Sequence, residues 1–119
     1  MKKILIVDDE PQFLELLKEK LIGRYRVVAA LDGESGIQMA LDEKPDLILS
    51  DILMPHMDGY EMLEALQKHG ETKNIPFIML TAVEDTSSIY KAKDYGVTDY
   101  LIKPAHLEEL TNLLKRYLG

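Results

Sequence analysis

The sequence contains no cysteine and only three histidines. The absence of cysteine excludes disulfides, thiolate catalysis and cysteine-based zinc sites. The histidines, His56, His69 and His106, are not spaced as metal ligands, which excludes a histidine-rich metal site. No apolar run approaches the ~18 residues that a membrane helix needs. The first run ends at Asp8, too early for a signal peptide. We therefore expect no membrane contact and a cytoplasmic location.

The chain also lacks an excess of basic residues. Its 119 residues include 21 Asp and Glu against 14 Lys and Arg, a net charge of −7. Direct binding to nucleic acid needs a basic face, so we expect none. The length fits one domain, since domains have roughly 100–200 residues, and no linker divides the chain. We expect one domain over residues 1–119, and the sequence leaves open whether it stands alone or belongs to a longer protein.

Five short apolar runs alternate with longer segments of helical period. Continuous apolar runs of this length are typical of strands buried on both faces of a parallel sheet. The predicted strands are 4–7, 25–30, 47–49, 77–80 and 100–102. The predicted helices are 11–22, 33–42, 59–68, 84–94 and 106–118. This alternation predicts an α/β fold of five strand–helix repeats, with a parallel sheet covered by helices on both faces.

Residues at several helix ends agree with these boundaries. Pro11 suits the first turn of its helix, and Asp9 or Glu10 could supply the N-terminal cap. Gly23 is expected just after the same helix, where glycine accepts a left-handed backbone. Gly70 is expected to close the helix over 59–68.

Polar residues follow four of the five predicted strands. In an open α/β sheet, ligands bind outside the carboxyl ends of the strands, so these side chains should converge on one edge. They are Asp8 and Asp9, Asp51, Thr81, and Lys103.

Each of these residues also has an ordinary structural interpretation. Asp8 and Asp9 could cap the first helix, and Thr81 could cap the fourth. Asp51 could be a turn residue, and Lys103 could be a solvated rim lysine. If all these structural interpretations were correct, four separate strand ends would carry residues suited to one common site only by chance. We therefore favour a functional site.

The combination makes physical sense with a bound cation. Neighbouring strands lie about 4.8 Å apart, and three carboxylates that close repel each other. A hard divalent ion such as Mg²⁺ relieves this repulsion and keeps ligand positions for phosphate oxygens. Lys103 adds a positive charge and Thr81 a hydroxyl donor. The sequence has no glycine-rich phosphate loop. The pattern thus predicts phosphoryl transfer with a carboxylate as acceptor.

The strand-end motifs resemble those of the receiver domains of two-component response regulators. The matching segments are Ile6-Val7-Asp8-Asp9-Glu10, Ser50-Asp51-Ile52-Leu53-Met54-Pro55, Met57-Asp58-Gly59, Leu80-Thr81-Ala82 and Tyr100-Leu101-Ile102-Lys103-Pro104. The resemblance covers the whole chain. It implies a flavodoxin-like sheet with strand order 2-1-3-4-5.

The resemblance also implies a role for each site residue. Asp51 accepts a phosphoryl group from a histidine kinase or a histidine phosphotransfer protein. Mg²⁺ is bound directly by Asp9, Asp51 and the backbone carbonyl of Leu53, and through water by Asp8. Lys103 and Thr81 contact the phosphoryl oxygens. The bond between Lys103 and Pro104 is expected to be cis.

Two further expectations concern signalling. Phosphorylation should draw Thr81 inward and let Tyr100 rotate from an exposed to a buried position, which changes the surface formed by 84–94, 99–102 and 106–118. That surface, with Ile89 or Tyr90 as apolar anchors, should contact a downstream protein, an output domain or a second copy in a dimer. The resemblance also implies that Leu53 and Val83 flank the path of the hydrolytic water. Neither side chain can hydrogen-bond a water, so the phosphorylated state should be long-lived.

Two other functions are alternatives to a phosphoacceptor. One is a docking module that works without phosphorylation, which usually goes with loss of an acid or the lysine. The other is a Mg²⁺-dependent phosphatase, which commonly presents Asp-x-Asp after the first strand. Here the five site residues are present and Asp8 and Asp9 are adjacent. We therefore favour a phosphoacceptor that is not an enzyme acting on outside substrates.

Overall fold

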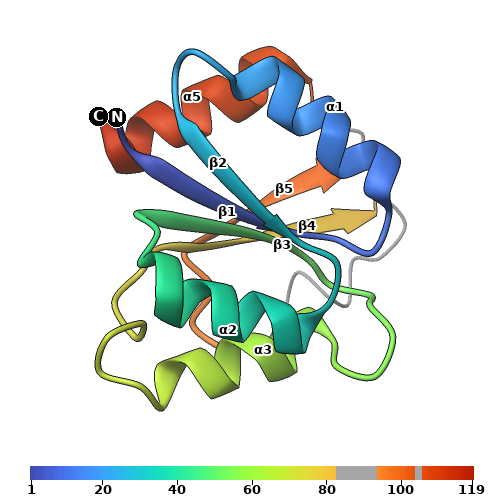
Figure 1. The fold of residues 1–119 in the computed structure, drawn as a ribbon, viewed down its shortest axis with the longest axis vertical. Helices are drawn as coiled ribbons and strands as arrows, with labels where there is room; N and C mark the ends of the chain where they lie inside the picture. The colour runs from blue at the N-terminus through green and yellow to red at the C-terminus, as the bar shows by residue number, and fades with distance from the viewer. Residues whose placement is uncertain (83–93, 104–105) are drawn as a thin grey trace.

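The computed structural model describes residues 1–82, 94–103 and 106–119. Five parallel strands form one sheet in the order β2-β1-β3-β4-β5, as the resemblance implies (Figure 1). The strands are β1 (Lys3–Val7), β2 (Arg26–Ala30), β3 (Leu47–Asp51), β4 (Phe77–Ala82) and β5 (Asp99–Lys103). The helices are α1 (Pro11–Leu21), α2 (Gly33–Glu43), α3 (Gly59–Gln67) and α5 (Leu107–Leu118). The predicted helix over 84–94 falls outside the described residues except for its last position.

The helices cover both faces of the sheet, so the predicted three layers are confirmed. Figure 1 shows α1 and α5 on one face and α2 and α3 on the other. Side chains along β1 alternate between two buried clusters, as the period of a strand requires. Ile4 and Ile6 belong to the cluster under α1 and α5, while Leu5 and Val7 belong to the cluster under α2 and α3.

The prediction that every strand is buried on both faces holds only for the centre of the sheet. All the residues of β3 up to Ser50 are buried, whereas β2 and β5 are partly exposed. Their position explains the difference, because β2 and β5 are the edge strands and are less completely covered.

The helix ends match the predictions in part. Gly23 follows α1 in the left-handed region, with φ 89°, as expected. Side-chain capping of α1 by Asp9 or Glu10 is wrong, since Glu10 is the N-cap residue but its side chain accepts no capping hydrogen bond. Gly70 does not close α3, which ends at Gln67 with Lys68 as its C-cap.

The start of α3 positions the loop that follows β3. Asp58 caps α3 in a reciprocal capping box with Glu61. Gly59 packs so closely on the chain that a Cβ atom there would lie 2.6 Å from the backbone oxygen of Asp51. A side chain at that position would displace the end of β3, so glycine is required by contact and not by φ.

Candidate functional site

The carboxyl ends of the central strands meet at one edge of the sheet, as predicted. In register, Val7 lies beside Ser50 and Asp51 beside Leu80. An open cavity lies outside this edge. Its lining residues are Asp9, Glu10, Asp51, Ile52, Leu53, Leu80, Thr81 and Lys103.

Lys103 forms ion pairs with two of the aspartates, Asp8 and Asp51. Its Nζ lies 2.8 Å from Asp8 Oδ2 and 3.4 Å from Asp51 Oδ2. The lysine side chain is only 21% exposed, and that of Asp8 is fully buried. The alternative that Lys103 is a solvated rim residue is therefore wrong.

Asp8 has a structural task as well as this ion pair. Its Oδ1 accepts a hydrogen bond of 2.9 Å from the backbone N–H of Glu10, directly before α1. The interpretation of Asp8 as a cap of the first helix is therefore only partly correct. Its carboxylate orders the chain just before α1, but Glu10 is the N-cap residue. Both carboxylate oxygens of Asp8 have a partner within the chain.

Asp51 is the more accessible of the two carboxylates that Lys103 contacts. Its side chain is 15% exposed and its Oδ1 accepts a hydrogen bond from the N–H of Ile52. Burial raises the pKa of Asp51 above its usual value; the charge of Lys103 opposes this rise and that of Asp8 adds to it.

Lys103 remains a cation in this setting. Burial by itself lowers the pKa of Lys103, but the hydrogen bond to Asp8 and the charges of Asp51 and Asp8 outweigh burial and leave that pKa raised. The site therefore combines a fixed positive charge with a carboxylate that faces a cavity.

The acids supply a donor set suited to a hard cation. Carboxylate oxygens of Asp8, Asp9 and Glu10 lie within 4.8 Å of one another. Asp51 lines the same cavity as Asp9 and Glu10. Clustered carboxylate oxygens are what Mg²⁺ prefers, so the residues present fit that ion. On sequence alone, Glu10 is considered only as a possible helix cap, although its position next to Asp8 and Asp9 is a signal for the cation site.

The remaining predicted residues occupy different depths of the site. Thr81 is buried at the end of β4 and lines the cavity. Leu53 also lines it but is 72% exposed. Tyr100 lies on β5 outside the cavity lining and is 40% exposed, the starting position that the switch hypothesis requires. Among the other predicted residues, Ile89, Tyr90, Val83 and Pro104 fall outside the described residues.

The family follows from a sequence comparison. A profile of the response regulator receiver domain family matches residues 4–115. The chain belongs to this family. Receiver domains are regulatory parts of two-component systems, and phosphorylation by a histidine kinase is the general function of the family.

Individual relatives agree with the family match. The receiver domain is 36% identical to the protein PilH of Pseudomonas aeruginosa, over 100% of this chain and 99% of that protein. It superposes on the chemotaxis protein CheY4 of Vibrio cholerae with a TM-score of 0.92, at 33% identity and with 99% of each chain covered. It superposes on the receiver domain of the sensor histidine kinase PA1611 of Pseudomonas aeruginosa with a TM-score of 0.90, at 30% identity, covering 99% of this chain and 98% of that one. The latter structure has a magnesium ion coordinated in the active-site cleft.

Several other curated relatives are longer than this receiver domain. The chain spans about half or less of the length of those relatives, which include a hybrid signal transduction histidine kinase and transcriptional regulators. Within the described part of the chain, no helix has the length and apolarity needed to cross a membrane.

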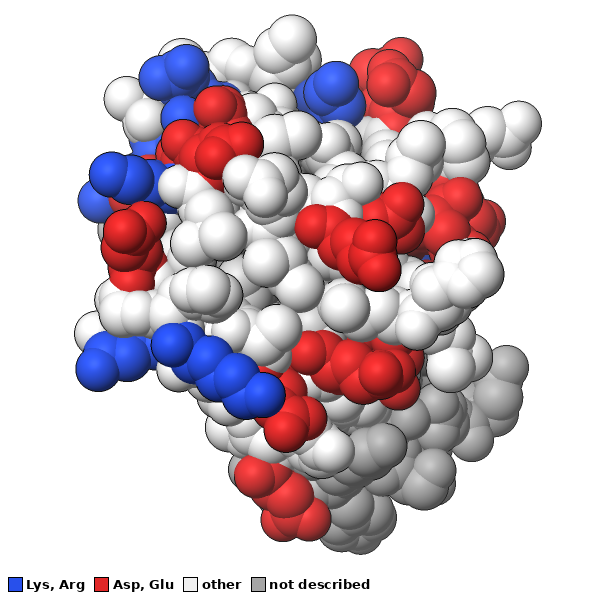
Figure 2. Space-filling model, turned by 60° about the horizontal axis from the view of Figure 1, so that its bottom comes forward, with Lys and Arg blue, Asp and Glu red and all other residues white. Residues whose placement is uncertain are grey.

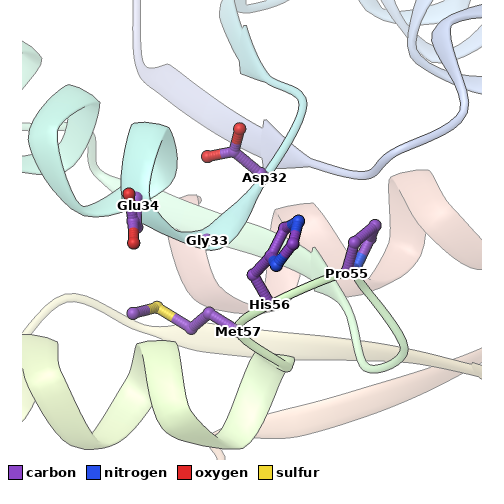
Figure 3. Close-up of a pocket in the computed structure, with 6 residues that line it drawn as sticks. All are labelled: Asp32, Gly33, Glu34, Pro55, His56 and Met57. Atoms are coloured by element: carbon purple, nitrogen blue, oxygen red, sulfur yellow. The ribbon is translucent and has the colours of Figure 1, made fainter.

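A second pocket lies on the side of the receiver domain that carries α2 and α3. Figure 3 shows its wall formed by Asp32, Gly33 and Glu34 around the start of α2, and by Pro55, His56 and Met57 after β3. The Asp32 carboxylate already accepts a hydrogen bond from the N–H of Ser35, which lowers the pKa of Asp32. Its role is thus to cap α2, and the chemistry of the receiver domain is better placed in the cavity beside Asp51.

The raised pKa of Asp51 gives a stability prediction. At pH 7, Asp51 lowers the free energy of unfolding, because its pKa is higher in the folded protein than in the unfolded chain. Without Mg²⁺, Asp51→Asn should therefore raise the free energy of unfolding at pH 7, and the gain should disappear below about pH 4, the unfolded-state pKa. Urea unfolding at both pH values, with Asp42→Asn on α2 as control, measures the effect. A less stable Asp51→Asn variant at pH 7 would contradict it.

Proposed function

We propose that Asp51 of this receiver domain accepts a phosphoryl group from a histidine kinase or a histidine phosphotransfer protein. The observation that carries the proposal is the pairing of a cavity-facing Asp51 carboxylate with Lys103 Nζ at 3.4 Å. A carboxylate oxygen attacks the phosphorus, the bond from phosphorus to the donor histidine nitrogen breaks, and that nitrogen takes a proton from water. Lys103 offers a cation to the phosphoryl oxygens, and Thr81 offers a hydroxyl.

The proposal includes Mg²⁺ at the acidic cluster. Asp9, Asp51 and the backbone carbonyl of Leu53 would hold the ion directly, and Asp8 would do so through water. When bound, the ion supplies positive charge that offsets the crowded carboxylates and the incoming phosphate. The grouping of Asp8, Asp9 and Glu10 oxygens within 4.8 Å supports this assignment.

Incubation with acetyl phosphate, with and without Mg²⁺, tests the proposed chemistry. Intact-mass measurement should show a stoichiometric, Mg²⁺-dependent phosphoryl adduct that is stable in acid and labile in base. A docking module that works without phosphorylation would give no adduct. A phosphatase would consume the donor over many turnovers. Either result would contradict the proposal.

Metal binding predicts a thermal shift. Mg²⁺ that binds the folded chain stabilises it by mass action, so the thermal midpoint should rise with Mg²⁺ concentration. At a concentration of 100 times the Kd, the stabilisation is about 2.7 kcal/mol. Asp9→Ala should lose most of the shift, while Glu64→Ala on the exposed face of α3 should keep it. Equal shifts in wild type and Asp9→Ala would place the ion elsewhere.

We further propose that phosphorylation reaches partners through Thr81 and Tyr100. Thr81 moves toward the phosphoryl group, and Tyr100 turns into the space beside β4. The exposed side chains of Tyr100 and Ile102 on β5 and of Leu107 on α5 support β5 and α5 as parts of a contact surface. That surface, completed by residues 84–94, would bind a downstream protein, an output domain or a second copy.

The Thr81→Ala variant tests this coupling, which needs only ~1–3 kcal/mol. In wild type, phosphorylation should shift the NMR signals of β5 and α5. In Thr81→Ala those shifts should shrink while the adduct on Asp51 still forms. Identical shifts in both proteins would show that Thr81 does not carry the switch.

Surface charge supports protein partners over nucleic acid. On the face with α2 and α3, acidic side chains are spread widely, and Lys and Arg gather toward one edge (Figure 2). The exposed acids there include Glu34, Asp42, Glu61 and Glu64. We accordingly propose that residues 1–119 form one receiver domain that works in the cytoplasm by protein contact, without binding nucleic acid or membrane itself.

A further inference from the structure

An aromatic ring covers the lysine of the site. The Nζ atom of Lys103 lies 4.5 Å from the centre of the Phe13 ring, within the range of a cation–π contact. We propose that Phe13 is a positioning residue that holds the Lys103 ammonium in place for phosphoryl transfer to Asp51. This inference rests on the proposed function of Asp51, which it deepens.

The contacts of Lys103 explain why a ring is needed. The ammonium has the Asp8 carboxylate at 2.8 Å and that of Asp51 at 3.4 Å. The lysine ammonium is a strongly hydrated point charge on a flexible stem. The two carboxylates attract this charge but do not by themselves fix where the ammonium sits or where its N–H groups point. A ring face attracts the cation and keeps water from it, yet takes up none of its three N–H donors in a conventional hydrogen bond.

Phe13 is itself held firmly enough to serve as a fixed reference. It lies in the first turn of α1, partly buried against the cluster that contains Leu14 and Leu17. The same stretch of chain is ordered by Asp8, which accepts from the N–H of Glu10. Asp8 and Phe13, which lie five residues apart in the chain, therefore both contact the Lys103 ammonium. When a phosphoryl group arrives at Asp51, the donors of Lys103 can turn toward it while the ring still holds the ammonium.

The alternative is that Phe13 only packs against the core. Site-specific replacement of Phe13 by mono-, di- and trifluorinated phenylalanine separates the two roles, because fluorine weakens the negative face of the ring and leaves its shape nearly unchanged. The rate of Asp51 phosphorylation by acetyl phosphate should fall stepwise along the series. The trifluoro ring and Phe13→Leu should each cost about five-fold, as expected for a partly exposed cation–π contact. Phe13→Tyr should stay within about two-fold of wild type, since tyrosine keeps the ring face.

A double-mutant cycle assigns the effect to Lys103. In a Lys103→Met background, Phe13→Leu should cause no further loss of rate. The signals of the Lys103 side-chain CH₂ group next to the ammonium, measured without phosphate or Mg²⁺, should show a ring-current shift that Phe13→Leu removes and Phe13→Tyr keeps.

Each outcome decides one claim. A flat rate across the fluorinated series, or an equal loss in the Lys103→Met background, would overturn the role of Phe13 even while the adduct forms on Asp51. A wild-type protein that forms no adduct on Asp51 would overturn the proposed function, and with it the role of Phe13 in transfer. The Lys103 shift would in that case still report whether the ring contact exists in solution.

Discussion

Lys103→Met should lower the free energy of unfolding in Mg²⁺-free buffer at pH 7 by about 3 kcal/mol. The reason is the Asp8 carboxylate, which is fully buried and has Lys103 Nζ at 2.8 Å as its cationic partner. Methionine keeps most of the apolar stem but leaves that carboxylate without a counter-charge. An uncompensated buried charge is among the few changes that destabilise a domain this strongly.

Two comparisons isolate this effect by urea unfolding. In the double variant Lys103→Met/Asp8→Asn, most of the lost stability should return, because the charge that lacked a partner is gone. Lys115→Met, on the exposed side of α5, should change the free energy of unfolding by no more than about 0.5 kcal/mol. If Lys103→Met cost no more than Lys115→Met, the ion pair with Asp8 would not contribute to folding.

The second large effect concerns how long a phosphoryl group on Asp51, as proposed above, would last. Hydrolysis needs a water placed in line with the bond that breaks, and positioning of a nucleophile accounts for several kcal/mol of a barrier. Leu53 stands beside the cavity with a 72% exposed apolar side chain that cannot orient water. We therefore expect slow loss of the phosphoryl group.

Substitutions at this position test the lifetime directly. After loading Asp51 and removing the donor, decay should be about ten-fold faster in Leu53→Asn, because the amide can hold the water. It should be faster again in Leu53→Asn/Val83→Glu. Leu53→Ile, which stays apolar, is the control and should decay at the wild-type rate. Fast decay in wild type, or decay unchanged by the polar substitutions, would mean that other groups place the water.

The grouping of residues in the candidate site was largely predictable because strand ends are easy to locate in the sequence. The runs that end before Asp8, Asp51 and Lys103 are apolar and short, and parallel topology brings such ends to one edge. Four of the five predicted strand-end residues line the cavity, while Asp8 is fully buried outside the lining and has Lys103 as its partner. The strand order came from the resemblance to a known family, since periodicity does not say which strands are neighbours.

Other features depended on tertiary contacts that periodicity cannot report. Phe13 falls on the apolar stripe of its helix, which predicts burial but not a position over the Lys103 ammonium. His56 has a left-handed backbone, with φ 68°. The sequence does not indicate this conformation, because the residue is not a glycine. Helix capping was only the alternative interpretation of Asp8, and the sequence pattern does not report that one of its carboxylate oxygens contacts Lys103 Nζ at 2.8 Å.

The most direct test of the account locates the phosphoryl group. Wild type, Asp51→Asn and Asp58→Asn are each incubated with acetyl phosphate and Mg²⁺ and their intact masses are measured. Asp58→Asn is the matched control, because asparagine also caps a helix and Asp58 caps α3. The account predicts one phosphoryl group per chain on wild type and Asp58→Asn and none on Asp51→Asn. A wild-type level of adduct on Asp51→Asn would contradict it.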